Sequence, residues 1–125
     1  MIGYVTLGTN DLQRAAGFYD ALLAELGAKR LWDMDRGILW GVSTEKPSLC
    51  LMKPYDGKAA THGNGTMVAL AVEKPEQVDR IYQKALALGA TDEGPAGPRG
   101  DSFYCGYFRD LDGNKLNVFC MPPKA

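Results

Sequence analysis

The amino-acid sequence repeats itself at half its length. An offset of 63 positions (67 minus 4) places Tyr4 on Met67 and superposes further apolar residues. The other superposed pairs are Val5 and Val68, Leu7 and Leu70, Tyr19 and Tyr82, and Leu23 and Leu86. After one deletion, residues 26–28 and 88–90 both read Leu-Gly-Ala. Self-similarity at a fixed period is typical of a supersecondary unit that is built more than once. The chain is therefore expected to fold as two similar halves.

The first half reads as one strand, one helix and three further strands. Residues 2–8 alternate and are rich in β-branched side chains, which predicts a strand. Asn10-Asp11 provides an N-cap, apolar residues then recur at helical spacing, and Gly27 ends the predicted helix. Three short strands are predicted near residues 28–33, 38–43 and 48–53.

The second half follows the same order. A loop rich in glycine and small residues, 56–65, precedes a strand predicted at 66–72 and a helix that starts around Pro75 and stops at Gly89. From about residue 90 the chain passes through a Gly/Pro loop, 94–100, to strands predicted at 103–109 and 115–121. Residues 110–114, Asp-Leu-Asp-Gly-Asn, predict a tight hairpin, because Asp-Gly or Gly-Asn can adopt the positive φ that such a turn requires. The pair of aspartates resembles a calcium loop, but the glycine and glutamate spacing of that loop is absent.

Length and composition are typical of one domain with neither a nucleic-acid nor a membrane partner. At 125 residues the chain is near the usual size of a single domain. Its net charge is -1 and it has no basic cluster, which argues against nucleic acid. No apolar run is long enough to cross a membrane, and no signal peptide is recognised. Three cysteines without Cys-x-x-Cys spacing favour a reducing cytoplasm over a disulfide framework.

Several of these segments together resemble the glyoxalase/bleomycin resistance/dioxygenase family, which is the vicinal oxygen chelate superfamily. The resemblance covers nearly the whole chain. It rests on the strand at 2–7, the helix entry Asn10-Asp11-Leu12 with Phe18-Tyr19, the strand at 67–72, and residues 107–114, which read Tyr-Phe-Arg-Asp-Leu-Asp-Gly-Asn. The family's hairpin motif usually has proline where this chain has Leu111.

The resemblance implies an α+β fold of two βαβββ modules. Their sheets are expected to curl into a mixed β-sheet cup, with the helices outside and a small-molecule site within. Residues 1–125 would then form one domain, with module one at about 1–55, a linker at about 56–65 and module two at about 66–121. Analogy with the family also implies a homodimer.

Alternation along the strands separates a face packed under the helices from a candidate ligand face. It also places Tyr104 and Tyr107 on opposite faces of their strand, while Trp32 and Trp40 offer further aromatic walls. Arg99, in the Gly/Pro loop, is suited to clamp a carboxylate or phosphate. The predicted pocket residues are Tyr4, Thr6, Trp40, Cys50, Met52, Met67, Arg99, Tyr107, Asn117 and Phe119.

The resemblance also indicates where metal ligands would lie. In metal-dependent relatives these come from the first and last strands of each module, usually as His, His or Gln/Glu, and Glu. The corresponding positions in this chain are Tyr4, Met67, Asn117 and Cys50. These side chains offer almost none of the imidazole and carboxylate donors that Zn, Ni, Fe or Mg sites require, although Cys and Met suit a soft ion such as Cu(I). No metal or other cofactor is predicted, and metal-dependent dioxygenase chemistry is disfavoured.

Two functions remain open at the level of the sequence. One is binding of a small organic molecule without turnover, as in bleomycin resistance proteins, although a nearly neutral chain argues against cationic bleomycin itself. The other is a glyoxalase-like lyase or isomerase that uses His62 or an atypical metal site. His62 is the only histidine and the candidate general acid or base. A nucleophilic pair of Cys50 and His62 is a further alternative.

Overall fold

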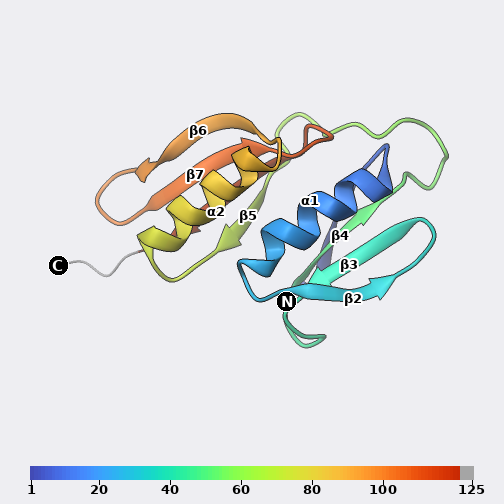
Figure 1. Cartoon of the computed structure of the whole chain (residues 1–125), viewed down its shortest axis with the longest axis horizontal. Coiled ribbons are helices and arrows are strands. Elements are labelled where there is room, and N and C mark those ends of the chain that lie inside the picture. Colours follow the sequence, from blue (N-terminus) through green and yellow to red (C-terminus); the bar gives the residue numbers. More distant parts are fainter. Residues whose placement is uncertain (122–125) are drawn as a thin grey trace. The chain divides into compact units, whose positions relative to one another are not determined.

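The chain folds into two compact units, Met1–His62 and Gly63–Ala125. The structure is a computed structural model that describes residues 1–121 (Figure 1). Each unit contains one helix and one four-stranded sheet. We refer to the units as module one and module two.

Module one has the βαβββ order predicted from the sequence. Its elements are β1 (Tyr4–Gly8), α1 (Leu12–Ala24), β2 (Lys29–Asp33), β3 (Gly37–Gly41) and β4 (Ser48–Met52). The strand order in the sheet is β1-β4-β3-β2. The first and last strands, β1 and β4, pair in parallel, whereas the other neighbours are antiparallel.

Module two repeats this arrangement. Its elements are β5 (Val68–Ala71), α2 (Pro75–Ala87), β6 (Thr91–Pro98), β7 (Tyr104–Arg109) and β8 (Lys115–Cys120). The strand order is β5-β8-β7-β6, and β5 pairs with β8 in parallel. The predicted α+β class and the two βαβββ modules are confirmed.

The repeat extends to individual positions. Both helices contain 13 residues, and their first residues, Leu12 and Pro75, lie 63 positions apart (75 minus 12). The predicted helix stops, Gly27 and Gly89, both have positive φ angles, 76° and 105°. Such a backbone conformation suits glycine because it has no Cβ.

Both helix starts use the chemistry that the sequence predicts. The Asp11 carboxylate accepts a hydrogen bond from the Arg14 backbone N–H, so that it caps α1. Pro75 lies in the first turn of α2, where its missing N–H has no intrahelical partner. The Gln77 side-chain oxygen accepts hydrogen bonds from the backbone N–H groups of Glu73 and Lys74, which satisfies further donors at this end.

The predicted hairpin at residues 110–114 is confirmed. The Asp110 carboxylate accepts hydrogen bonds from the backbone N–H groups of Asp112 and Asn114, both at 2.9 Å. Gly113 has a φ angle of 88°. The side chain of Asp110 therefore holds the turn from within, and both Asp110 and Asn114 are buried.

The prediction of a Gly/Pro loop at residues 94–100 is wrong. Strand β6 continues through Pro98 and pairs with β7, although the register shifts between Asp92 and Gly94 and again between Gly94 and Gly97. Because β6 is the edge strand of its sheet, only one side of it needs to donate hydrogen bonds. Proline is tolerated at an edge and at bulges, which explains how a Gly/Pro-rich segment forms a strand here.

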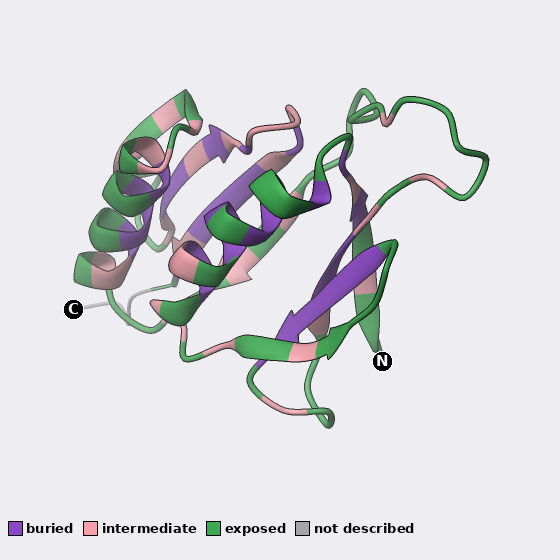
Figure 2. Cartoon of the chain, turned by 45° about the vertical axis from the view of Figure 1, so that its right-hand side comes forward, coloured by how far each residue is buried: buried purple, intermediate pink, exposed green. Residues whose placement is uncertain are grey.

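Each helix covers one face of its own sheet. Helix α1 contacts β2, β3 and β4, and α2 contacts β6, β7 and β8. The buried residues of each helix lie on the side turned toward its sheet, as Figure 2 shows. In residues 1–121, no helix is both long enough and apolar enough to span a membrane.

A polar clasp joins α1 to two strands of module one. The Asp20 carboxylate accepts two hydrogen bonds from the Arg30 guanidinium, at 2.9 and 2.7 Å. It also accepts one from the indole N–H of Trp40 at 2.8 Å. Trp40 is only 1% exposed, so Asp20 supplies the acceptor for a donor that lies in the core.

Removing this acceptor is expected to destabilise the protein. Asp20→Ala leaves the buried indole N–H without a partner and should lower the free energy of unfolding by about 1–3 kcal/mol. Asp20→Asn keeps an acceptor but loses the charge, so its loss should be smaller. Urea unfolding followed by circular dichroism measures both, with the exposed Glu45→Ala as control. Equal stability of Asp20→Ala and the wild type would contradict this role.

The contribution of Asp20 should also depend on pH. The hydrogen bonds that Arg30 donates, more than the one that Trp40 donates, hold the pKa of the Asp20 carboxyl below its usual value. Because the folded-state pKa is lowered, Asp20 stabilises the protein fully at pH values above the unfolded-state pKa of about 4. This stabilisation is lost as the pH falls from there through the lowered folded-state pKa. The difference in unfolding free energy between the wild type and Asp20→Asn is therefore expected to shrink when urea unfolding is measured at progressively lower pH.

Candidate functional site

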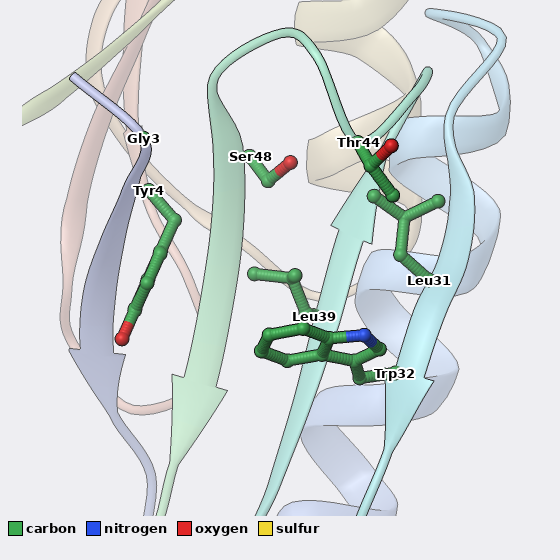
Figure 3. A pocket seen from close by; sticks show the side chains of 7 residues that line it. All are labelled: Gly3, Tyr4, Leu31, Trp32, Leu39, Thr44 and Ser48. Carbon is green, nitrogen blue, oxygen red and sulfur yellow. The ribbon is translucent and has the colours of Figure 1, made fainter. Parts of the chain in front are cut away.

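A hollow of about 150 Å³ lies on the sheet of module one (Figure 3). Two aromatic side chains stand at it, Tyr4 from β1 and Trp32 from β2, and they are 57% and 56% exposed. Exposed aromatic side chains that gather at one hollow are typical of a ligand site. The full lining consists of Gly3, Tyr4, Leu31, Trp32, Leu39, Thr44 and Ser48.

The hollow lies on the face of the sheet that α1 does not cover. Leu39 lines it, whereas the next residue, Trp40, points to the helix and is bound by Asp20. Successive residues of a strand point to opposite faces, so the residues paired with Leu39 share its open face. These are Cys50 on β4 and Trp32 on β2. Thr6 is paired with Cys50 and completes a row across all four strands.

Two glycines keep side chains off the same face. A Cβ at Gly37 would lie 2.7 Å from the Met52 side chain, and a Cβ at Gly41 would lie 2.5 Å from the Ser48 hydroxyl. Both distances are shorter than real contacts of a Cβ. The glycines therefore let Met52 and Ser48 lie across β3.

A bulge in β2 determines which tryptophan reaches the hollow. Arg30 is paired with Trp40, but Trp32 is paired with Leu39, so Leu31 is an extra residue. An extra residue reverses the faces of the residues that follow it. Trp32 consequently lies on the open face, and Trp40, which the sequence assigned to the pocket, lies in the core below α1.

In module two, the predicted pocket residues Tyr107, Asn117 and Phe119 lie on one face of the sheet. Tyr107 and Asn117 are directly paired across β7 and β8, and Phe119 follows two residues later. The stacked ring of Phe103 lies 5.3 Å from that of Phe119. The other face of β7 turns to α2, where Tyr104 donates a hydrogen bond to Asp79. The predicted separation of Tyr104 from Tyr107 is confirmed.

Positive charge gathers on the open face of module two. The Arg99 guanidinium lies 5.9 Å, and the Lys115 ammonium 5.3 Å, from the centre of the Tyr107 ring. The Arg99 guanidinium also donates hydrogen bonds to the carbonyls of Pro95 and Pro98 at 2.7 and 3.2 Å. The structure thus brings Arg99 close to Tyr107.

The four positions that the resemblance matches to metal ligands carry donors other than the imidazole and carboxylate groups usual in the family. In module one, burial raises the pKa of the Cys50 thiol, which opposes the thiolate that binds metals. In module two, the Asn117 amide donates a hydrogen bond to the Gly106 carbonyl, and Met67 offers a thioether. Tyr4 offers a phenol oxygen. Among residues 1–121, no three His, Cys, Asp or Glu side chains gather so as to hold a metal ion.

The structure places His62 in the exposed loop between β4 and β5. This loop is anchored upstream of His62, where the Ala60 backbone N–H donates a hydrogen bond to the Asn10 side chain at 2.7 Å. Cys50 is 3% exposed and has a hydrogen bond to Thr6. His62 is not among the residues that line the hollow.

Two βαβββ modules with the same strand order define a glyoxalase-like α+β fold. Residues 1–118 match the sequence profile of the Glyoxalase/Bleomycin resistance protein/Dioxygenase superfamily. The chain belongs to this superfamily. A comparison with curated proteins gave no match.

Solved structures agree with this assignment. A glyoxalase/bleomycin resistance protein from Albidiferax ferrireducens T118 is 36% identical with a TM-score of 0.89, over 98% of this chain and 99% of that one. A lactoylglutathione lyase from Agrobacterium tumefaciens (19% identity, TM-score 0.70) and the fosfomycin resistance protein FosX from Listeria monocytogenes (18%, 0.72) each cover 96% of this chain and 92% of their own. These last two likenesses concern the fold alone.

Sequence reasoning missed most of the residues that line the hollow. Leu39 and Ser48 could have been found, because they alternate in step with Cys50 along paired strands. Leu31 and Thr44 carry no such signal, since one is the bulged residue and the other lies in the turn after β3. Thr6, Cys50 and Met52 lie on the open face of the sheet, as alternation along the strands predicted, but they do not line the hollow itself.

The burial of the thiols leads to a test of the proposed pair of Cys50 and His62. All three cysteines are free and buried, and burial raises the pKa of both Cys50 and Cys120. A chromogenic disulfide reagent should react with the native protein on the order of a hundredfold more slowly than with the urea-unfolded chain, because reaction requires local opening. A rapid reaction of one thiol in the native protein, lost in Cys50→Ala, would instead support a nucleophilic Cys50.

Proposed function

We propose that this protein binds a small organic molecule with an aromatic ring on the open face of module one. The observation that carries the proposal is the hollow between the exposed rings of Tyr4 and Trp32. Its volume of about 150 Å³ is comparable to that of an apolar cavity that holds benzene. One aromatic ring of a ligand therefore fills it.

The chemistry of the lining favours binding over catalysis. Apart from the phenol of Tyr4, the lining has no side chain that ionises. The hydroxyl groups of Thr44 and Ser48 can orient a ligand through hydrogen bonds, while leucine and aromatic groups supply apolar contact. Binding without turnover also agrees with the bleomycin resistance proteins in the name of the superfamily. Under this proposal the alternative, a lyase or isomerase that uses His62, is disfavoured.

Ligand binding to the hollow is expected to raise thermal stability and to change tryptophan fluorescence. A thermal-shift screen of aromatic metabolites, thiol conjugates and antibiotics identifies ligands, because binding to the native state alone stabilises it by about 2.7 kcal/mol at a hundredfold excess over Kd. The exposed Trp32 then reports binding, whereas the buried Trp40 serves as a constant background.

Variants distinguish the hollow from the rest of the surface. Tyr4→Ala and Trp32→Ala should each weaken binding of a screening hit by roughly tenfold, as expected for loss of an aromatic contact of about 1.4 kcal/mol. Tyr55→Ala is the matched control, because Tyr55 is aromatic and 92% exposed but does not line the hollow. His62→Gln should also leave Kd unchanged. A screen without hits, or hits that bind Tyr4→Ala and Trp32→Ala normally, would contradict the proposal.

Ligand binding is proposed to occur without a divalent metal, because the donors at Tyr4, Cys50, Met67 and Asn117 do not fit one. Protein purified without chelator should contain less than stoichiometric transition metal by elemental analysis, and a chelator should leave Tm unchanged. A stoichiometric metal whose removal lowers Tm would refute this part of the proposal. Such a metal would also favour the enzymatic alternative.

We further propose that the protein is a homodimer and that it is located in the cytoplasm. Analogy with the superfamily supports the dimer, and three free cysteines support a reducing compartment. Light scattering of the purified protein determines the oligomeric state.

A further inference from the structure

The open face of module two carries two cations close to one aromatic ring. Arg99 and Lys115 both approach the Tyr107 ring, within the distance of about 6 Å at which a cation interacts with an aromatic face. Nearby Arg109 is paired with Glu93. Within the described range 1–121, neither Arg99 nor Lys115 forms an ion pair.

The two cations are held in place by different means. Lys115 begins β8 and is paired with Arg109 in the ladder. Arg99 follows the edge strand β6, and its hydrogen bonds to Pro95 and Pro98 use two of the five N–H donors of a guanidinium. The remaining donors allow Arg99 to bind a planar anion.

We propose that this face binds the carboxylate of a small aromatic acid, with Arg99 and Lys115 as its charged contacts. Both cations lie within 6 Å of the centre of the same ring, so an anion that contacts one of them at the edge of this ring is attracted by both. The stacked rings of Phe103 and Phe119 lie on the adjacent part of module two, and both are half-buried. They offer an apolar surface to the body of the same ligand. The site rests on module two alone and so extends beyond the function proposed for module one.

Benzoate and its neutral analogue benzyl alcohol provide matched probes. In a titration followed by backbone amide resonances, benzoate should shift those of Gly94, Tyr107 and Asn117, which are paired neighbours in the sheet. Lys115→Met and Arg99→Gln should each raise the Kd for benzoate by roughly threefold to tenfold, because each removes one charged contact. Lys115→Arg keeps the charge and should bind like the wild type. The exposed Lys58→Met is the control for net charge.

Several results would overturn the proposal. One is equal affinity for benzyl alcohol and benzoate at these resonances. Another is an unchanged Kd in both Arg99→Gln and Lys115→Met, with folding verified by circular dichroism. Inorganic phosphate that binds as tightly as benzoate would show that the aromatic body contributes nothing. Trp32 fluorescence reports the module-one hollow separately, since both tryptophans lie in that module. Failure of one site is therefore distinguishable from failure of the other.

Discussion

The parallel pairing of the first and last strands in each module constrains everything else in that module. Parallel strands cannot be joined by a tight turn, so the chain must cross over between them. Here the crossover contains one helix and two antiparallel strands, which leads from β1 to β4 and from β5 to β8. The helix then covers one face of the sheet and leaves the other face open. The hollow of module one and the cations of module two both lie on such a face.

Local chemistry made most of this frame predictable from the sequence. The helix boundaries follow from an N-cap at Asp11, a proline in the first turn and glycines with positive φ at 27 and 89. Strand faces follow from alternation, which correctly separated Tyr104 from Tyr107. What could not be predicted depends on register between distant segments. Alternation alone does not reveal that Leu31 is an extra residue, so Trp40 was assigned to the pocket in place of Trp32. The clasp of Asp20, Arg30 and Trp40 has no local signature either.

The two modules share a backbone arrangement but differ in the chemistry of their open faces. In module one, that face has neutral hydroxyl, thiol and aromatic groups around Leu39. In module two, the equivalent face carries Arg99 and Lys115 over Tyr107. The cores under the helices stay alike, since Val5 and Leu49 are paired as Val68 and Leu116 are. Duplication thus preserved packing while the faces away from the helices diverged, as is common when one fold supports several functions.

The bulge after each helix occurs at equivalent places, between Arg30 and Trp32 in one module and between Asp92 and Gly94 in the other. In module one it divides a five-residue strand into two parts with separate tasks. Arg30, before the bulge, is committed to the helix through Asp20, whereas Trp32, beyond it, is free to contact solvent or a ligand. A substitution of Trp32 therefore changes the open face without disturbing the core between the sheet and α1. A deletion of one residue at the bulge, in contrast, would reverse the faces of the strand residues that follow it, so that the side chain now exposed on the open face would turn toward the helix.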